Sequence, residues 1–111
     1  MELRVLNYFV ATAQELNMTR AAQKLLVSQP ALSRQIADLE DELGVKLFNR
    51  QPRHLTLTPA GQYLYEQAKE ILTLASKTKS NLQSSAVISG DLTIAAGESF
   101  AMQRLMNIVS N

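Results

Sequence analysis

Apolar residues between positions 28 and 43 follow the spacing of one helix face. They stand at steps of four, three and four residues, at Leu32, Ile36, Leu39 and Leu43. Such steps keep side chains on one side of a helix, which has about 3.6 residues per turn. Ser28 suits the N-cap of this run, and Pro30 fits the first turn, where a backbone N–H is not needed. We therefore expect a helix over Gln29–Leu43.

A shorter helix is expected just before it. Asn17 can serve as its N-cap, and Ala21, Ala22 and Leu25 form a face of small residues that lets a neighbouring helix approach closely. Two helices joined by a tight break have the layout of a helix-turn-helix, whose second helix enters the major groove of DNA. An ordinary helical hairpin in a small α domain fits the same stretch, because helix pairs are common.

The polar side of the second helix carries a gradient of charge. Its outward positions near the start are small, polar or basic: Gln29, Pro30, Ser33, Arg34 and Ala37. Its acidic residues stand toward the far end: Asp38, Glu40, Asp41 and Glu42. DNA phosphates attract basic groups and repel carboxylates. The gradient therefore predicts that the start of this helix enters the groove.

Two short runs after Gly44, at residues 47–50 and 55–58, flank a polar turn and predict a β-hairpin, or wing. Its apolar residues are expected to pack on the helices: Leu47, Leu55, Leu57 and, as a further candidate, Phe48. Basic side chains are expected at the tip, where they could reach a minor groove or a phosphate: Arg50, Arg53 and His54. Taken alone, these residues also fit a solvated loop.

A long helix is predicted to begin at Pro59, with Thr58 as its N-cap. Its apolar residues follow a heptad-like line that is flanked by Tyr65 and Leu72: Leu64, Ala68, Ile71, Ala75 and Leu82. At 1.5 Å per residue such a helix is roughly 40 Å long, more than a domain of this size can cover. We expect it to pair with the same helix of a second copy. The alternative is a helix that folds back on its own domain.

The sequence pattern after the long helix, at residues 89–111, is that of a strand followed by a helix. Ser89 and Gly90 suit a hinge, residues 91–95 suit a strand, and residues 100–109 suit a helix with Ser99 as its N-cap. This order is typical of the opening of an α/β domain. One strand and one helix cannot form a parallel sheet, so we expect that domain to be incomplete in this chain.

Four motifs in register carry a family resemblance. They are A-A-x-x-L at residues 21–25, S-Q-P-A-L-S-R-Q-I at 28–36, L-E-x-x-L-G-x-x-L-F-x-R at 39–50 and L-T-x-A/P-G at 57–61. In this order and at these spacings the sequence resembles the LysR-type transcriptional regulators over essentially the whole chain. The resemblance implies a mainly α protein with three parts. These are a winged helix-turn-helix domain over residues 1–58, a linker and dimerisation helix over 59–88, and the start of a truncated effector-binding domain over 89–111.

The resemblance also implies roles for particular residues. The base-reading positions would be Gln29, Pro30, Ser33 and Arg34. The contacts to the DNA backbone would come from Thr19, Ser28 and Gln35, and those of the wing from Arg50 and Arg53. A homodimer would bind a partly palindromic operator, and a full-length protein would form a tetramer and use Ser99 toward a small-molecule effector. This chain alone is then expected to bind double-stranded DNA without responding to an effector.

Composition and charge exclude several classes of function. The formal net charge is only +1, with 11 Lys and Arg against 10 Asp and Glu, so any positive field must come from placement. There is no cysteine and a single histidine, and neither metal-ligand spacing nor a phosphate-binding glycine loop occurs. We therefore expect no enzyme, metal or cofactor, and a cytoplasmic protein without a membrane span. The rival to DNA binding is a dimerisation or adaptor module whose long helix binds another protein.

Overall fold

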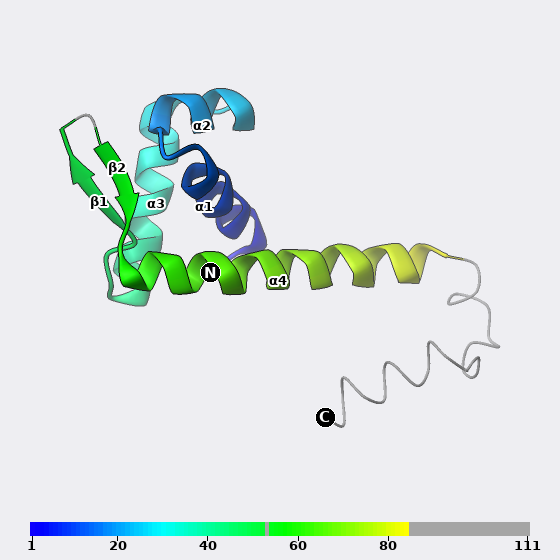
Figure 1. Ribbon diagram of the computed structural model, residues 1–111. Helices are drawn as coiled ribbons and strands as arrows, with labels where there is room; N and C mark the ends of the chain where they lie inside the picture. Colours follow the sequence, from blue (N-terminus) through cyan, green and yellow to red (C-terminus); the bar gives the residue numbers. More distant parts are fainter. Residues whose placement is uncertain (53, 85–111) are drawn as a thin grey trace. The chain divides into compact units, whose positions relative to one another are not determined.

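The computed structural model describes residues 1–52 and 54–84, and the elements in this part are mainly helical (Figure 1). In chain order they are α1 (Leu3–Glu15), α2 (Met18–Leu25), α3 (Gln29–Leu43), β1 (Phe48–Gln51), β2 (His54–Leu57) and α4 (Pro59–Gln83). The predicted order of a helix pair, a hairpin and a long helix is thereby confirmed, and α1 precedes it. The strand and helix expected over residues 89–111, with Ser99, lie outside the described residues.

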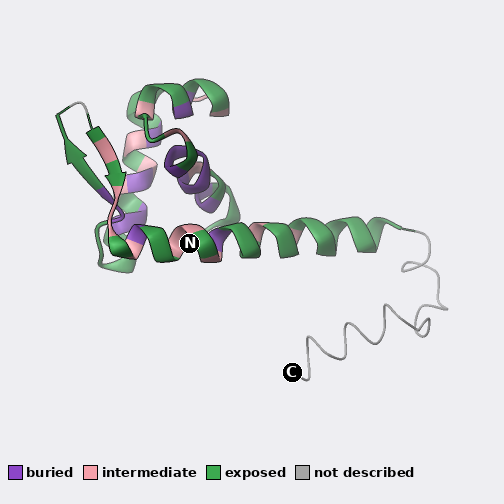
Figure 2. Ribbon diagram, in the orientation of Figure 1, coloured by how far each residue is buried: buried purple, intermediate pink, exposed green. Residues whose placement is uncertain are grey.

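The core of the first compact unit, Met1–Thr73, lies between the helices and the start of the hairpin. Figure 2 shows buried segments on α1, α3 and the first half of α4. Phe9 of α1 is fully buried, and its ring centroid lies 5.4 Å from that of Phe48 at the start of β1. Burial of such large apolar side chains is the main favourable contribution to the fold.

Side-chain caps fix where three helices begin. Asn17 Oδ1 accepts a hydrogen bond from the backbone N–H of Arg20 at 2.9 Å, and Ser28 Oγ accepts one from Ala31 at 3.2 Å. Thr58 Oγ1 accepts one from Gly61 at 2.9 Å. Each oxygen satisfies an N–H group that has no partner inside its own helix. All three caps were predicted from sequence and are confirmed.

The buried face of α3 differs from the predicted one at its end. Leu32, Ile36 and Leu39 are buried as expected, but Leu43 is exposed and Glu40 is buried. The reason lies in the chain that follows Gly44, whose φ of 73° ends the helix and turns the backbone. After that turn Leu47 is buried and joins the core cluster, so an apolar side chain from beyond the helix contributes to the core and Leu43 does not.

The wing is an antiparallel hairpin of two short strands, in which Phe48 pairs with Leu57 and Gln51 with His54. The predicted hairpin is confirmed, with both strands displaced by one residue from their expected limits. Arg50 pairs with Leu55 in the middle of the strands and therefore does not lie at the tip, as was expected. Arg53 lies outside the described residues.

Candidate nucleic-acid interface

The first half of α3 presents polar and basic side chains away from the core. Gln29, Pro30 and Arg34 are exposed, and Ser33 is half-buried. The opposite side of the same turns is fixed by Leu32 and Ile36, which are fully buried. The four residues predicted to read bases therefore lie together on one rigid element, which is the arrangement that a recognition helix requires.

Arg34 is the most exposed charge on this surface, with a side chain that is 79% exposed. Its Nε lies 4.0 Å from Oδ2 of Asp38, one helical turn further on. Because both side chains are open to solvent, this ion pair contributes little to stability. The guanidinium therefore stays available for an external acceptor, and Asp38 lies closer to the predicted reading surface than the charge gradient alone suggested.

The predicted contacts to the DNA backbone lie on α2, at the N-cap of α3 and on α3 itself. Thr19 is exposed in the first turn of α2, and Gln35 is half-buried on α3. Ser28 accepts the capping hydrogen bond from Ala31, which leaves its hydroxyl proton free to be donated to a phosphate oxygen. These positions combine an N-cap, a helix start and polar side chains, all of which are common phosphate contacts.

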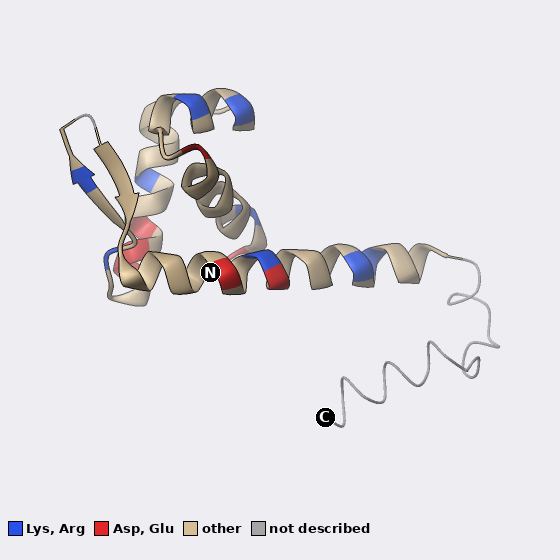
Figure 3. Cartoon of the chain, viewed as in Figure 1, with Lys and Arg blue, Asp and Glu red and all other residues tan. Residues whose placement is uncertain are grey.

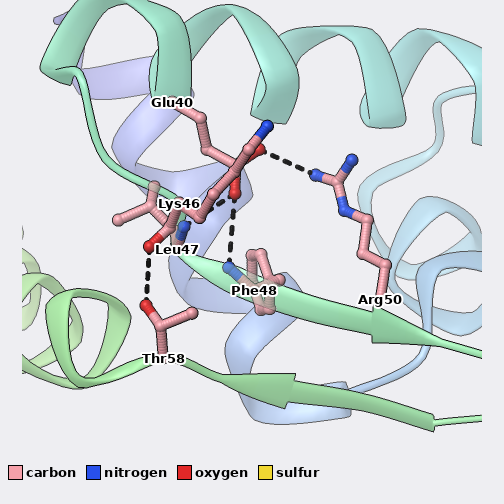
Figure 4. Close-up of polar contacts among 6 residues, drawn as sticks. All are labelled: Glu40, Lys46, Leu47, Phe48, Arg50 and Thr58. Carbon is pink, nitrogen blue, oxygen red and sulfur yellow. Dashed lines mark hydrogen bonds and ion pairs between the residues drawn. The ribbon is translucent and has the colours of Figure 1, made fainter.

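The wing contributes one described arginine, and a buried carboxylate holds it. Arg50 Nη2 donates to Oε1 of Glu40 at 3.2 Å (Figure 4). The other oxygen of Glu40 accepts from the backbone N–H groups of Leu47 at 2.7 Å and Phe48 at 3.3 Å. The Glu40 side chain is 2% exposed, whereas that of Arg50 is 39% exposed. Arg50 can therefore face both the protein and an outside ligand.

Glu40 is a residue that sequence reasoning misplaced. It was grouped with the solvated acids at the end of α3, but it lies one residue beyond Leu39 and points inward with it. The signal was present in the motif L-E-x-x-L-G-x-x-L-F-x-R, which places a glutamate ten residues before Arg50. The positions of acidic residues along a helix do not by themselves show which carboxylates are buried.

Charge is separated along α3. Figure 3 shows the acidic residues of α3 at its C-terminal end and basic residues on α2, on the first half of α3 and on the wing, with further charges of both signs on α4. His54 is exposed on β2, on the same hairpin as Arg50. Along α3, basic groups at one end and acids at the other favour the approach of a polyanion to the basic end.

The residues predicted to pair two copies share one face of α4 but differ in burial along the helix. Leu64 and Leu72 pack partly against the core, and Ala68 is fully buried in it. Because Ala68 has no exposed surface, it is removed from the expected interface, and the alternative of a helix packed on its own domain holds for this part of α4. Further along α4 the accessible or partly accessible apolar side chains include Ile71, Leu74, Ala75 and Leu82, of which Leu74 lies outside the heptad-like line.

Within residues 1–52 and 54–84, no group of three or more His, Cys, Asp or Glu side chains is placed to hold a metal ion. No helix in that part is both long and apolar enough to cross a membrane.

A comparison with protein families shows the family to which the chain belongs. The model for bacterial regulatory helix-turn-helix proteins of the lysR family matches residues 3–62, which run from the start of α1 to the first turn of α4. The chain belongs to the LysR family. The match covers the helix-turn-helix pair, the wing and the cap of the long helix, so the resemblance drawn from the four motifs is confirmed.

Curated relatives are transcriptional regulators by name. The chain is 47% identical over 97 residues to the Hca operon transcriptional activator HcaR of Escherichia coli, covering 87% of this chain and 32% of that protein. It is 55% identical over 75 residues to the HTH-type transcriptional regulator BudR of Klebsiella aerogenes, covering 68% of this chain and 52% of that protein. The chain thus spans about a third to a half of the length of these two relatives.

Solved structures of LysR proteins share the fold. The BenM DBD in complex with catB site 1 DNA has a TM-score of 0.75 and 43% identity, and the match covers 81% of this chain and 95% of that one. The CbnR DBD in complex with DNA has a TM-score of 0.70 and 46% identity, over 72% of this chain and 92% of that one. At these identities the likeness extends to the arrangement of the helix-turn-helix and the wing.

Proposed function

We propose that this chain is the DNA-reading part of a transcriptional regulator of the LysR type. The observation that carries the proposal is the exposed first half of α3, where Gln29, Pro30 and Arg34 project from a helix whose opposite face is buried. The DNA complexes of BenM and CbnR, at 43% and 46% identity, support the same use of this surface.

In this proposal α3 lies in the major groove and each exposed side chain meets a base edge that suits its chemistry. Arg34 can donate two hydrogen bonds to guanine, and Gln29 can both donate to and accept from adenine. Pro30 offers an apolar surface to a thymine methyl group, and Ser33 can donate or accept. Each well-formed base contact contributes about 1–3 kcal/mol of discrimination between sequences.

Contacts to phosphates would fix the position of α3 in the groove. On the helix-turn-helix they would come from Thr19, Ser28 and Gln35, and on the wing from Arg50, Arg53 and His54. Hydroxyl, amide and basic side chains at these places carry no sequence information, but they set the register of the protein on the duplex. The wing would lie along the flank of the site, over the neighbouring minor groove.

We further propose that two copies bind together through α4. A single small module binds DNA modestly, and two linked modules gain affinity through their effective concentration. A twofold dimer places two recognition helices one helical turn or a multiple apart, which calls for a partly palindromic operator. The accessible apolar side chains of α4 that would meet a second copy are Ile71, Leu74, Ala75 and Leu82.

The test is a selection of bound sequences from random duplexes by the full chain, followed by sequencing. The matched variants are Arg34→Ala, which removes a reading side chain, and Lys69→Ala, which removes the same charge from α4. We expect the wild-type chain and Lys69→Ala to enrich one partly palindromic motif. Arg34→Ala should lose at least one base preference and bind roughly tenfold to a hundredfold more weakly.

Two results of this selection would contradict part or all of the proposal. A folded, dimeric wild-type chain that enriches no sequence would overturn the proposal and favour an adaptor module that binds another protein through α4. Enrichment of a single half-site would keep the reading role of α3 and overturn the dimer. Because the chain spans only part of its relatives, an effector response through Ser99, a tetramer and the expected location beside chromosomal DNA in the cytoplasm remain predictions for the whole protein.

A further inference from the structure

The position of Glu40 calls for an explanation, because a buried carboxylate is costly unless hydrogen bonds replace its lost water. An apolar side chain there would have continued the inward face formed by Leu32, Ile36 and Leu39. The three hydrogen bonds that Glu40 accepts come from the start of the wing, at residues 47, 48 and 50. The carboxylate therefore links α3 to the wing.

The wing depends on such links for its orientation. A hairpin with strands of four residues is marginally stable by itself, so the segment that precedes it must be held by its neighbours. Glu40 holds that segment from α3. From the other side, the Thr58 backbone N–H donates to the Leu47 carbonyl at 3.0 Å, and Thr58 Oγ1 donates to the Lys46 carbonyl at 2.6 Å.

Arg50 has further capacity once Glu40 has bound it. A guanidinium carries five N–H donors in a fixed plane, and the hydrogen bond to Glu40 uses one of them, on Nη2. The side chain stays 39% exposed. An arginine that is restrained at one edge and open at the other loses less side-chain entropy when it binds a second acceptor.

We propose that Glu40 is a positioning residue for DNA binding. Its carboxylate sets the wing at a fixed orientation to the recognition helix and holds the Arg50 guanidinium so that its free donors meet a phosphate at the flank of the site. Glu40 itself touches no DNA. This inference rests on the proposed function, because it assigns the means by which the wing and α3 bind the same duplex together.

The variant Glu40→Gln separates the two parts of this role, which are to hold the start of the wing and to hold Arg50. An amide has a single oxygen, and if that oxygen stays on the N–H groups of Leu47 and Phe48, the amide NH₂ faces the Arg50 guanidinium. Two donors then oppose each other, and Arg50 is released while the start of the wing stays bound. Asp41→Asn is the matched control, because it makes the same change of charge at an exposed position on the next residue of α3.

The double variant Glu40→Gln with Arg50→Gln keeps the inference testable if the single variant folds poorly. Two facing amides can hydrogen-bond each other without charge, so the contact between positions 40 and 50 is restored while the guanidinium is absent. All variants are compared by thermal unfolding, by affinity for the selected duplex over a salt series, and by hydroxyl-radical footprinting.

We expect Glu40→Gln to bind roughly tenfold more weakly, as for the loss of one charged hydrogen bond. Its footprint should shrink at the flanks and persist at the centre, and its salt slope should fall by about 0.9 for each phosphate that the wing no longer neutralises. Asp41→Asn should stay within about twofold of wild type, because exposed charges contribute little. The double variant should regain thermal stability and remain weak in binding.

Two results would overturn the inference while leaving the proposed function intact. One is a folded Glu40→Gln chain that binds with wild-type affinity and footprint. The other is a double variant that recovers affinity together with stability, since Glu40 and Arg50 would then act only within the fold. If the wild-type chain binds no duplex at all, the proposed function fails and this inference fails with it.

Discussion

Gly44 and Gly61 are needed for two different physical reasons. Gly44 ends α3 with a φ of 73°, and a side chain added there would meet nothing within 4 Å. Gly61 lies in the first turn of α4, and a Cβ added there would overlap the carbonyl oxygen of Leu47. The first glycine supplies a left-handed backbone conformation, and the second allows α4 to approach the start of the wing closely.

Alanine at each position should therefore destabilise the chain to a different extent. Gly44→Ala is expected to lower the free energy of unfolding by about 1 kcal/mol, from backbone strain alone. Gly61→Ala should lower it by about 1–3 kcal/mol or more, because the atom it meets belongs to the backbone and cannot rotate away. Urea unfolding of both variants gives the comparison, and equal losses would contradict this reading of Gly61.

At the scale of elements, sequence predicted the helices and their starts well, because caps and apolar spacing are local. Asn17, Ser28 and Thr58 all cap as expected. The errors arise where distant segments meet. The burial of Glu40 depends on the backbone of residues 47 and 48, and no periodicity within α3 contains that information. The same holds for Ala68, whose place in the core is set by the packing of α4 on the preceding helices.

In the candidate site, too, local features were predicted correctly and contacts between distant segments were not. The exposed reading face of α3 could be predicted by subtracting its apolar face, since both belong to one helix. Arg50 was expected at the tip of the wing and lies in the middle of its strands, because the register of a hairpin is decided by how its apolar residues meet the core. Contacts between elements therefore remain harder to predict than the elements themselves.

The accessible apolar residues of α4 lead to a prediction at the same scale. Ile71 is 37% exposed and Ala68 is fully buried, so glutamate at the two positions should act differently. Ile71→Glu should weaken or abolish the dimer and leave the monomer folded, because like charges would face each other across a twofold interface. Ala68→Glu should unfold the domain, because it places an unpaired carboxylate in the core. Sedimentation equilibrium and circular dichroism distinguish the two outcomes, and a dimer of Ile71→Glu with wild-type affinity would exclude this face.

For the whole molecule, the formal net charge is only +1, so the salt dependence of DNA binding is set by the basic side chains that are placed on phosphates. The proposed phosphate contacts include two arginines of the wing, Arg50 and Arg53, so a dimer would bring four. At about 0.9 per neutralised phosphate, four contacts predict a slope of log K against log salt of about −4. Affinity should then fall by roughly two to three orders of magnitude between 50 and 200 mM salt.

Fluorescence anisotropy with the selected duplex and with an unrelated one measures this slope and the contribution of sequence separately. Both duplexes should give similar slopes, because phosphates are common to them, while the selected duplex keeps a higher affinity at every salt concentration. A slope near zero would mean that the wing touches no phosphate. A slope steeper than about −7 would require basic residues beyond the two arginines of each wing, and Arg20 and Lys24 on α2 would be the first to substitute.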